Sequence, residues 1–360
     1  MRVFVGTYPA PAHANEPAQA EGIWHADFDV ESGQFTNLTQ VIEVPAASFL
    51  AVGADNQELF AVSETDPGNL SRFAITDAGL EHRQTVPTFG VDPCHVTIAA
   101  EQVVVTNYTS GSVASYRSSH PGAELVDGKV FQQSGQGPNI DRQAGPHAHF
   151  SAQIPTTQHV WVTDLGADRI IGYQITSYGE GTRQLVARGT AVEFPAGSGP
   201  RHIVFDGDTY AFVVGELNNT LYTVRIDELS GKGEVVHEHA LVGTVGPDTP
   251  SHLEINPEGT LLFVAVRGID NMQAFAIVRS DQNNTGAAPT LEPVGVFSCA
   301  GQGPRHFKTF GQRSDGLHVL AVANKKSGTL DVLGFDQTTG TGQLLSQENV
   351  PAPACIVNLN

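Results

Sequence analysis

Short apolar stretches separated by polar turns fill the whole sequence. They are rich in Val, Ile, Leu and Phe and are bounded by Gly, Pro, Asn or Asp, as at residues 59–64, 103–107 and 261–267. Their length is that of β-strands, about four to eight residues, and they lack the spacing of three and four that marks an amphipathic helix. The pattern therefore predicts an all-β chain.

These stretches recur as a unit with a period near ~50 residues, which is in the range of β-propellers. Each unit has a Pro-containing turn, often a His, a short apolar strand, a second apolar strand that ends in a polar residue, and a third strand. The linking segments, such as residues 241–245, are candidate fourth, outer strands. Six copies are complete, at residues 45–75, 92–117, 145–176, 199–227, 249–278 and 303–336.

A seventh copy is divided between the two ends of the sequence. Residues 354–357 match the first strand, residues 3–7 the second and residues 22–28 the third. A blade built from both ends closes a ring of sheets and removes its exposed edges. We therefore expect a single domain over residues 1–360, a seven-bladed β-propeller of four-stranded antiparallel blades.

The repeat also predicts where polar side chains gather. In an antiparallel sheet, the start of the first strand and the end of the second strand lie at the same end. Polar residues at these two positions in every copy should therefore face one mouth of the ring. They are Thr7, Glu64, Asn107, Asp164, Glu216, Arg267 and Asn324 at the second-strand ends, and His95, His147, His149, Arg201, His202, His252, Arg305 and His306 at the first-strand starts.

Residues that break the repeat are the strongest candidates for chemistry. Arg267 stands where other copies have Asn or an acid, and Arg201 and Arg305 stand where others have Cys, Ala or Ser. Two alternatives stay open. Histidines and asparagines that recur in phase can satisfy backbone groups between blades. Glu216 can belong to a buried network of glutamate and arginine.

Charge narrows the choice of ligand. The formal net charge is −19. Such an acidic chain lacks the basic surface of a nucleic-acid binder and is repelled by an anionic membrane surface. No stretch approaches the about 20 apolar residues of a membrane span. We expect a cytoplasmic monomer or weak homo-oligomer that contacts neither nucleic acid nor membrane. Arg outnumbers Lys by 14 to 5, and the guanidinium fork suits carboxylate or phosphate groups.

Several familiar signatures are absent or incomplete. The three cysteines, Cys94, Cys299 and Cys355, form no disulfide framework or metal knuckle and are expected to be reduced and buried. There is no G-x-S-x-G nucleophile motif. The Gly-x-Gly-Pro sequences at residues 135–138, 197–200 and 301–304 lack the context of nucleotide loops and read as inter-blade turns. His237 and His239 are too few for zinc, so we expect no cofactor and no metal.

Taken in order, a set of motifs resembles the seven-bladed propeller lactonases of the bacterial 6-phosphogluconolactonase type, a group that includes fungal 3-carboxy-cis,cis-muconate cyclase. The similarity covers essentially the whole chain. It implies active-site roles for His147 or His149, Arg201, Glu216 and Arg267, although Ala148 stands where the family has a second proline. The motifs are residues 5–8, 22–24, 137–149, 163–168, 199–202, 215–217, 266–268 and 303–306.

The residues and the resemblance together predict hydrolysis of a small anionic sugar lactone, with 6-phosphogluconolactone as the first candidate. Glu216 or a neutral histidine would deprotonate water, and arginines would hold the anion and the oxyanion. Two alternatives remain, a cyclase acting on a carboxylated muconate and a propeller that only binds partners. The predicted catalytic residues are Glu216, His147, His149, Arg201 and Arg267, and the predicted substrate-binding residues are Arg305, His306, Asn107, Asp164, Asn324 and His202.

Overall fold

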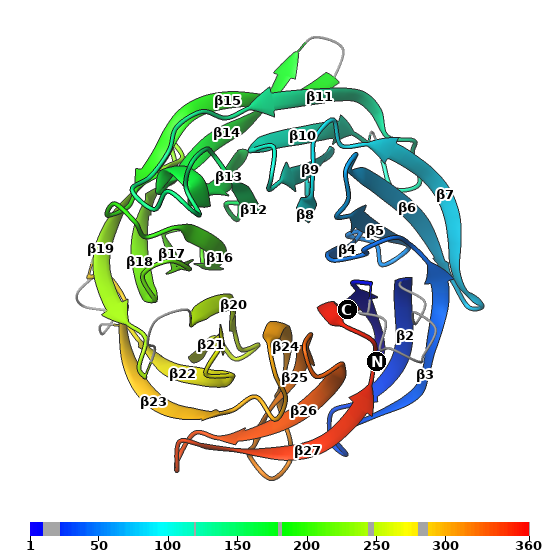
Figure 1. Ribbon diagram of the computed structural model, residues 1–360, viewed down its shortest axis with the longest axis vertical. Helices are drawn as coiled ribbons and strands as arrows, with labels where there is room; N and C mark the ends of the chain where they lie inside the picture. Colours follow the sequence, from blue (N-terminus) through cyan, green and yellow to red (C-terminus); the bar gives the residue numbers. More distant parts are fainter. Residues whose placement is uncertain (10–21, 119, 179–181, 244–247, 280–286, 360) are drawn as a thin grey trace. The chain divides into compact units, whose positions relative to one another are not determined.

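The computed structural model describes residues 1–9, 22–118, 120–178, 182–243, 248–279 and 287–359, and these are mostly β-strand. The strands form seven sheets of four, and the described strand pairings are antiparallel (Figure 1). The one helical element in the described part is the 3₁₀ turn η1 (Leu165–Ala167). The predicted all-β fold and four-stranded blades are confirmed.

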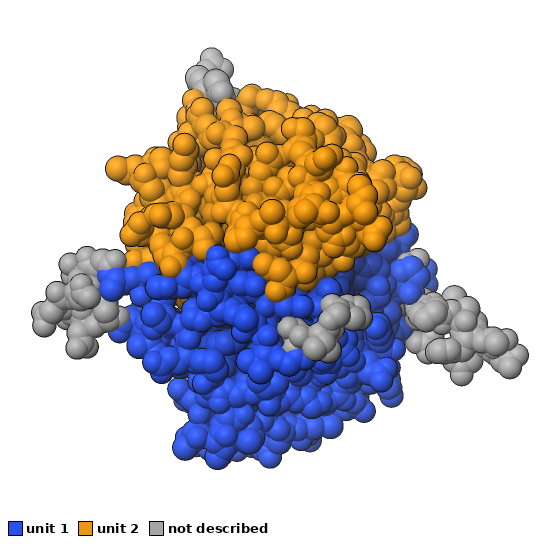
Figure 2. Space-filling model, turned by 60° about the vertical axis from the view of Figure 1, so that its left-hand side comes forward, with its two compact units in different colours: residues 1–47, 219–223, 237–360 blue, residues 48–218, 224–236 orange. Residues whose placement is uncertain are grey.

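The chain divides into two compact units, which Figure 2 colours blue and orange. Unit 1 comprises Met1–Ala47, Asn219–Thr223 and His237–Asn360, and unit 2 comprises Ser48–Asn218 and Val224–Val236. The prediction of a single domain stays a prediction. No helix in the described part of the chain is long and apolar enough to cross a membrane.

Unit 2 holds three complete blades and most of a fourth. Their first strands pack next to one another, β4 with β8, β8 with β12, and β12 with β16. Within each blade the order along the sheet follows the chain. The strands are β4 (Leu50–Val52), β5 (Glu58–Ser63), β6 (Asn69–Thr76) and β7 (Gly79–Pro87); β8 (Pro93–Ala99), β9 (Gln102–Asn107), β10 (Ser112–Arg117) and β11 (Val126–Gln132); β12 (Ala148–Gln153), β13 (His159–Asp164), β14 (Arg169–Tyr178) and β15 (Thr182–Glu193); β16 (Pro200–Asp206), β17 (Tyr210–Gly215), β18 (Thr220–Asp227) and β19 (Lys232–Ala240).

Unit 1 holds the other three blades. The first strands again pack together, β20 with β24 and β24 with β28. The strands are β20 (Thr249–Ile255), β21 (Leu261–Arg267), β22 (Asn271–Val278) and β23 (Thr290–Ser298); β24 (Pro304–Gln312), β25 (His318–Asn324), β26 (Thr329–Asp336) and β27 (Thr341–Asn349); β28 (Pro353–Asn358), β1 (Arg2–Thr7), β2 (Gly22–Asp29) and β3 (Gln34–Glu43).

The last of these blades is built from both ends of the chain, as the split repeat predicted. Its strand order is β28-β1-β2-β3, so the C-terminal strand pairs directly with the N-terminal one. Val5 and Ile356, which are paired across the two strands, are fully buried in the same apolar cluster. The sequence ends are thus held together by both hydrogen bonds and packing.

The second strand of each blade is buried on both of its faces, which explains its near-continuous apolar sequence. In β9 and β13 every residue is buried. A strand covered on one face only would alternate apolar and polar residues, whereas neighbouring blades cover both faces here. The polar residue that closes each second strand is therefore held at a fixed height at the end of a rigid sheet.

The expectation of an outer strand at residues 241–245 is wrong in its position. The fourth strand of that blade is β19, which ends at Ala240, and residues 241–243 follow it outside any strand; residues 244 and 245 lie outside the described part. The cause is composition, because β19 alternates exposed and half-buried positions and carries many polar residues. Such an outer strand has a weak apolar signal. The three cysteines are free and buried, as expected.

Candidate active site

A buried carboxylate held between two arginines forms the centre of the polar cluster in unit 2. Glu216 directly follows β17, and Arg201 is the second residue of β16. Arg201 donates from Nε to Oε2 of Glu216 at 2.6 Å, and Arg142 donates from Nη2 to Oε1 at 2.7 Å. Both oxygens of Glu216 therefore already accept from a guanidinium.

The two arginines differ in exposure. The side chain of Arg201 is 2% exposed and that of Arg142 is 38% exposed, while Glu216 is 5% exposed. Burial alone lowers the pKa of Arg142, but the Glu216 carboxylate outweighs this and raises that pKa above its ordinary value. Both arginines keep their charge, and Arg142 presents part of its guanidinium to solvent.

Tyr108 connects this cluster to His147. The hydroxyl of Tyr108, which directly follows β9, accepts a hydrogen bond from Nη2 of Arg142 at 3.2 Å. The rings of Tyr108 and His147 are stacked, with centroids 4.5 Å apart and an interplanar angle of 16°. One tyrosine thus contacts an arginine at its hydroxyl and a histidine at its ring face.

The single described hydrogen bond of the His147 ring fixes the role of one ring nitrogen. Nδ1 lies 2.9 Å from the backbone oxygen of Tyr108. A carbonyl oxygen can only accept, so Nδ1 carries the proton. In the neutral tautomer that makes this bond, the lone pair lies on Nε2, as a general base requires.

The backbone around His147 is fixed from two sides. Asp164, at the end of β13, accepts the backbone N–H of His147 at 2.9 Å, and the backbone oxygen of His147 accepts the N–H of Leu165 at 2.9 Å. Gly166 permits this approach, because a Cβ there would lie 1.9 Å from the oxygen of Gly145. His147 therefore sits on a rigid support.

Asp164 itself is fully buried. Burial raises the pKa of its carboxyl group, against the opposing effects of the His147 N–H and of Arg169 at 3.4 Å. Both of its oxygens serve protein groups. The substrate-binding role expected for Asp164 stays a prediction.

His149 and His202 lie deeper in unit 2. Their ring centroids are 5.3 Å apart, and His149 is 5.4 Å from the ring of Tyr108. His149 is 5% exposed, with Nδ1 4.0 Å from the sulfur of Cys94. The structure thus brings His147, His149 and His202 into one chain of ring contacts with Tyr108, and His147 is the most accessible of the three.

Unit 1 carries the predicted residues Arg267, Arg305, His306 and Asn324. Arg267, the last residue of β21, donates to the backbone oxygens of Thr249 and Pro250 at 3.3 Å each. Arg305 donates to the hydroxyl of Tyr8 at 2.5 Å, and Nζ of Lys325 lies 3.7 Å from the centre of the same ring. Arg267 and Arg305 belong to the other unit from Glu216, so their roles in its chemistry stay predictions.

Two recurrent histidines contact the backbone of the next blade. Nδ1 of His95 accepts from the N–H of Ser151 at 3.2 Å, and Nδ1 of His306 accepts from the N–H of Ile356 at 3.3 Å. This is the repeated structural role that the sequence left open. The ring of His306 also stacks on His252, with centroids 3.9 Å apart.

Asn107 and Asn324 repeat one another in the same way. Asn107 donates to the backbone oxygen of Thr88 at 3.0 Å, and Asn324 donates to that of Cys299 at 2.9 Å. Each thereby holds the segment that precedes its own blade. The structure gives both a structural contact, and their expected contact with substrate stays a prediction.

The sequence analysis did not name Arg142, Tyr108 or Lys325 as site residues. Arg142 lies in the long connection between β11 and β12, outside the repeated strand positions, and its only signal was a place in the family motif. Tyr108 and Lys325 each follow the second-strand end by one residue. The repeat therefore contains a signal for both residues, one position after the end of the second strand.

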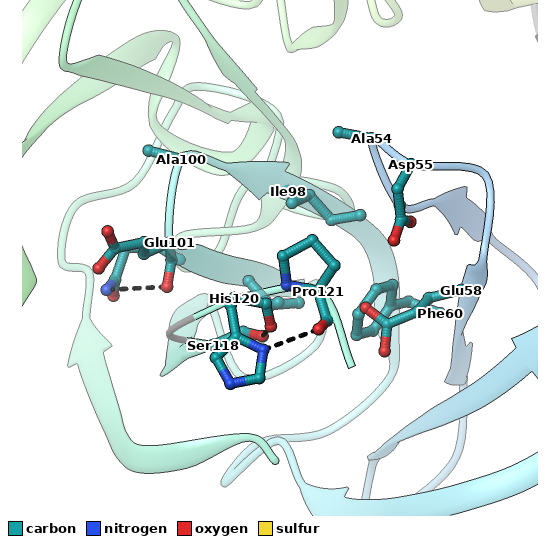
Figure 3. Close-up of a pocket in the computed structure, with 13 residues that line it drawn as sticks. Ala54, Asp55, Glu58, Phe60, Ile98, Ala100, Glu101, Ser118, His120 and Pro121 are labelled. Atoms are coloured by element: carbon teal, nitrogen blue, oxygen red, sulfur yellow. Dashed lines mark hydrogen bonds between the residues drawn. The ribbon is translucent and has the colours of Figure 1, made fainter. Parts of the chain in front are cut away.

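A separate pocket of about 250 Å³ lies at the opposite end of the unit 2 sheets (Figure 3). It is formed by the β4–β5 and β8–β9 turns and by the segment after β10, with Phe60, Ile98 and Pro121 among its apolar lining. None of the predicted site residues lines it. No group of three or more metal-binding side chains occurs among the described residues.

Comparison with known proteins finds one family along almost the whole chain. The family described as "Lactonase, 7-bladed beta-propeller" matches residues 2–358. An uncharacterised protein of Lactococcus lactis subsp. lactis is 25% identical over 348 residues, covering 94% of this chain and 96% of its own. An uncharacterised protein of Staphylococcus aureus (strain USA300) is 26% identical over 341 residues, covering 91% and 92%.

Two solved structures have the same fold and similar sequences. A candidate 6-phosphogluconolactonase of Bacteroides fragilis superposes with a TM-score of 0.84 at 25% identity, covering 100% of this chain and 98% of its own. The gluconolactonase PpgL of Pseudomonas aeruginosa, described as periplasmic, gives a TM-score of 0.84 at 25% identity, covering 99% and 98%. The fold is therefore that of a seven-bladed β-propeller, and the chain belongs to the family of seven-bladed β-propeller lactonases.

Proposed function

We propose that this protein hydrolyses a small anionic sugar lactone, with 6-phosphogluconolactone as the substrate and 6-phosphogluconate as the product. The family is a lactonase family, and a similar solved protein is described as a candidate for the same activity. The reaction would belong to carbohydrate metabolism, in the pentose phosphate pathway. The observation that carries the proposal is the link through Tyr108 between an arginine-rich cluster and His147, whose Nδ1–H donates to a backbone oxygen.

His147 is the general base in this proposal. Its Nδ1–H is fixed on the backbone oxygen of Tyr108, which leaves Nε2 to take a proton from water. Glu216 is less suited to this task, because each of its oxygens already accepts from an arginine. His149 is also less suited, because it is buried against Cys94.

The reaction then needs one water molecule and no other reactant. Nε2 of His147 removes a proton as the water oxygen bonds to the lactone carbonyl carbon, and negative charge develops on the carbonyl oxygen. The guanidinium of Arg142, which is part-exposed, stabilises that charge. When the ring C–O bond breaks, the leaving oxygen takes the proton back from His147, and the ring opens to a carboxylic acid.

Glu216 and Arg201 prepare this arrangement. Arg201 is buried and holds one oxygen of Glu216, and the other oxygen fixes Arg142. A preorganised guanidinium needs no reorganisation as charge develops, which is worth about 10²–10³ in rate for one donor. The expectation that Arg267 and Arg305 bind an anion stays a prediction, because both lie in unit 1.

The direct test is turnover by the purified protein. Freshly prepared 6-phosphogluconolactone should open faster than in buffer, both with and without a chelator, when proton release is followed in a pH-stat. Glucono-δ-lactone and 3-carboxymuconate serve as comparison substrates. Acceleration of muconate cyclisation without lactone opening would favour the cyclase, and no acceleration of any of the three would reject enzyme activity of this kind.

Variants identify the base. His147→Asn keeps a side-chain N–H for the Tyr108 oxygen and removes the basic nitrogen, so kcat should fall by about 10²–10⁴. His120→Asn, an exposed histidine in unit 2, is the matched control and should keep full activity. Similar kcat values for His147→Asn and wild type would exclude His147 as the base.

Cellular location and assembly belong to the same proposal. We infer a cytoplasmic enzyme that is a monomer or weak homo-oligomer and binds no nucleic acid. Fractionation of cells and size-exclusion chromatography test the two statements separately.

A further inference from the structure

Asp168 is a hub of hydrogen bonds immediately behind the active-site cluster of unit 2. It is 8% exposed and follows the turn η1 in the left-handed backbone region, with φ at 52°. Its Oδ1 accepts from Nε2 of Gln143 at 2.7 Å, from Oγ of Ser198 at 3.2 Å and from the N–H of Gly199 at 2.8 Å. Its Oδ2 accepts from the N–H of Gly197 at 2.7 Å.

One arm of this hub holds the segment that carries Arg142. Gln143 is fully buried, and its Nε2 also donates to the backbone oxygen of Leu165 at 2.9 Å. Its Oε1 accepts from the N–H of Asn139 at 3.1 Å, which closes the loop around it. Because Arg142 is the neighbour of Gln143 in the chain, the hydrogen bonds of Asp168 and Gln143 fix the backbone position from which the Arg142 side chain extends.

The other arm holds Arg201 and Glu216. Gly199, bound through its N–H to Asp168, precedes Arg201 by two residues. The backbone oxygen of the same Gly199 accepts the N–H of Glu216 at 2.8 Å. One carboxylate therefore supports the three residues of the Arg142–Glu216–Arg201 cluster from behind.

We propose that Asp168 is a positioning residue that fixes Arg142 and Arg201 on Glu216 for catalysis. This inference rests on the proposed lactone hydrolysis. Asp168 acts through the arginines and does not touch the substrate. A carboxylate is suited to the task because every group it meets is a donor, and four acceptor contacts use both of its oxygens.

Asp168→Asn is the conservative test. Asparagine also adopts the left-handed backbone region, so the turn is retained. Its amide nitrogen, however, would face a donor where Oδ2 now accepts from Gly197, and the negative charge is lost. Misplacement of catalytic groups by about 1 Å can cost about 10²-fold in rate. We expect a fall of about this size in kcat for 6-phosphogluconolactone.

The control is Glu58→Gln. Glu58 is another buried carboxylate of unit 2, paired with Arg72 at 2.8 Å, and it lies at the pocket of Figure 3 at the far end of the sheets. This substitution also removes one buried negative charge. Assayed well below the midpoint of its thermal unfolding, Glu58→Gln should keep wild-type kcat.

A double-mutant cycle separates positioning from a general structural effect. If Asp168 acts through Arg142, then Asp168→Asn should reduce kcat much less in an Arg142→Met background than in wild type. Equal losses in the two backgrounds, or a single-variant kcat within about threefold of wild type, would overturn the inference.

Proteolysis provides a readout that needs no activity. Trypsin cleaves after arginine, and the bond after Arg142 is held by the buried Gln143. Loss of the Asp168 hydrogen bonds in Asp168→Asn should accelerate cleavage at this bond, which mass spectrometry detects. Glu58→Gln should not change the rate of this cleavage. If wild type opens no lactone, the proposed function fails, and the rate of tryptic cleavage alone tests whether Asp168 holds the segment that carries Arg142. Unchanged cleavage would then overturn that role as well, and accelerated cleavage would support it.

Discussion

The Glu216 cluster allows a stability prediction whose size follows from exposure. Glu216→Gln replaces a carboxylate that serves two arginines with an amide that has one acceptor oxygen. Arg201 is 2% exposed and Arg142 is 38% exposed. The retained oxygen should stay with Arg201, because Arg142 can turn to solvent and Arg201 cannot.

The magnitude comes from the buried half of the cluster. Removing one partner of a buried ion pair costs about 3–5 kcal/mol of unfolding free energy, because a buried charge is left without compensation. Glutamine keeps one hydrogen bond, so we expect Glu216→Gln near the lower end, about 3 kcal/mol. An exposed pair is worth about 0–1 kcal/mol, so Arg142→Met should cost no more than about 1 kcal/mol.

Equilibrium urea unfolding measures both values, with circular dichroism and tryptophan fluorescence as independent probes. The double variant Arg201→Met/Glu216→Met removes both buried charges and should recover most of the loss, since apolar residues of similar volume can replace a buried pair. The reasoning is refuted if Arg142→Met costs as much as Glu216→Gln, or if the double variant is the sum of its single changes.

Three further predictions follow from local geometry. Gly199→Ala should cost clearly more stability in urea than Gly207→Ala, because both have positive φ but only at Gly199 would a Cβ meet a neighbour, Cγ of Leu217 at 2.5 Å; equal costs would reject the steric argument. Burial lowers the pKa values of His25 and His239, so the stability they contribute is complete above about pH 6.5 and is lost as the pH falls through their lower folded-state pKa values. Replacing both histidines by Asn should flatten the pH dependence of the urea midpoint between pH 7 and 5. An unchanged slope would contradict the assignment. Burial raises the pKa of Cys299 to about 12, and all three cysteines are buried, so a thiol reagent at pH 8 should react only after urea is added; rapid labelling of the folded protein would disprove this.

The sequence alone determined the blades and their three inner strands. A repeat of apolar strands allows few arrangements of the sheets, because the second strand of each blade must be covered on both faces. The divided blade followed for the same reason, since an unpaired first or last strand would leave a sheet edge exposed. The outer strand β19 was misplaced because a half-exposed strand carries too few apolar residues to be recognised.

Contacts within the candidate site could be expected from the sequence where they depend on the repeat, but not where they depend on a loop. Glu216 and Arg201 stand at repeated positions, and their contact could be expected from the antiparallel register. Arg142 meets Glu216, and Gln143 meets Asp168, only because the long connection between β11 and β12 folds back onto these residues. No local pattern encodes such a return.

The hydrogen-bond partners of each candidate base were also decided only by tertiary structure. The sequence left open whether Glu216 or a histidine accepts the proton of water. The carbonyl of Tyr108, which is 39 residues from His147 in the chain, fixes the ring's own proton on Nδ1, and both oxygens of Glu216 accept from arginines. Proton positions depend on which groups lie within hydrogen-bond distance, and distance between remote residues is a property of the folded chain.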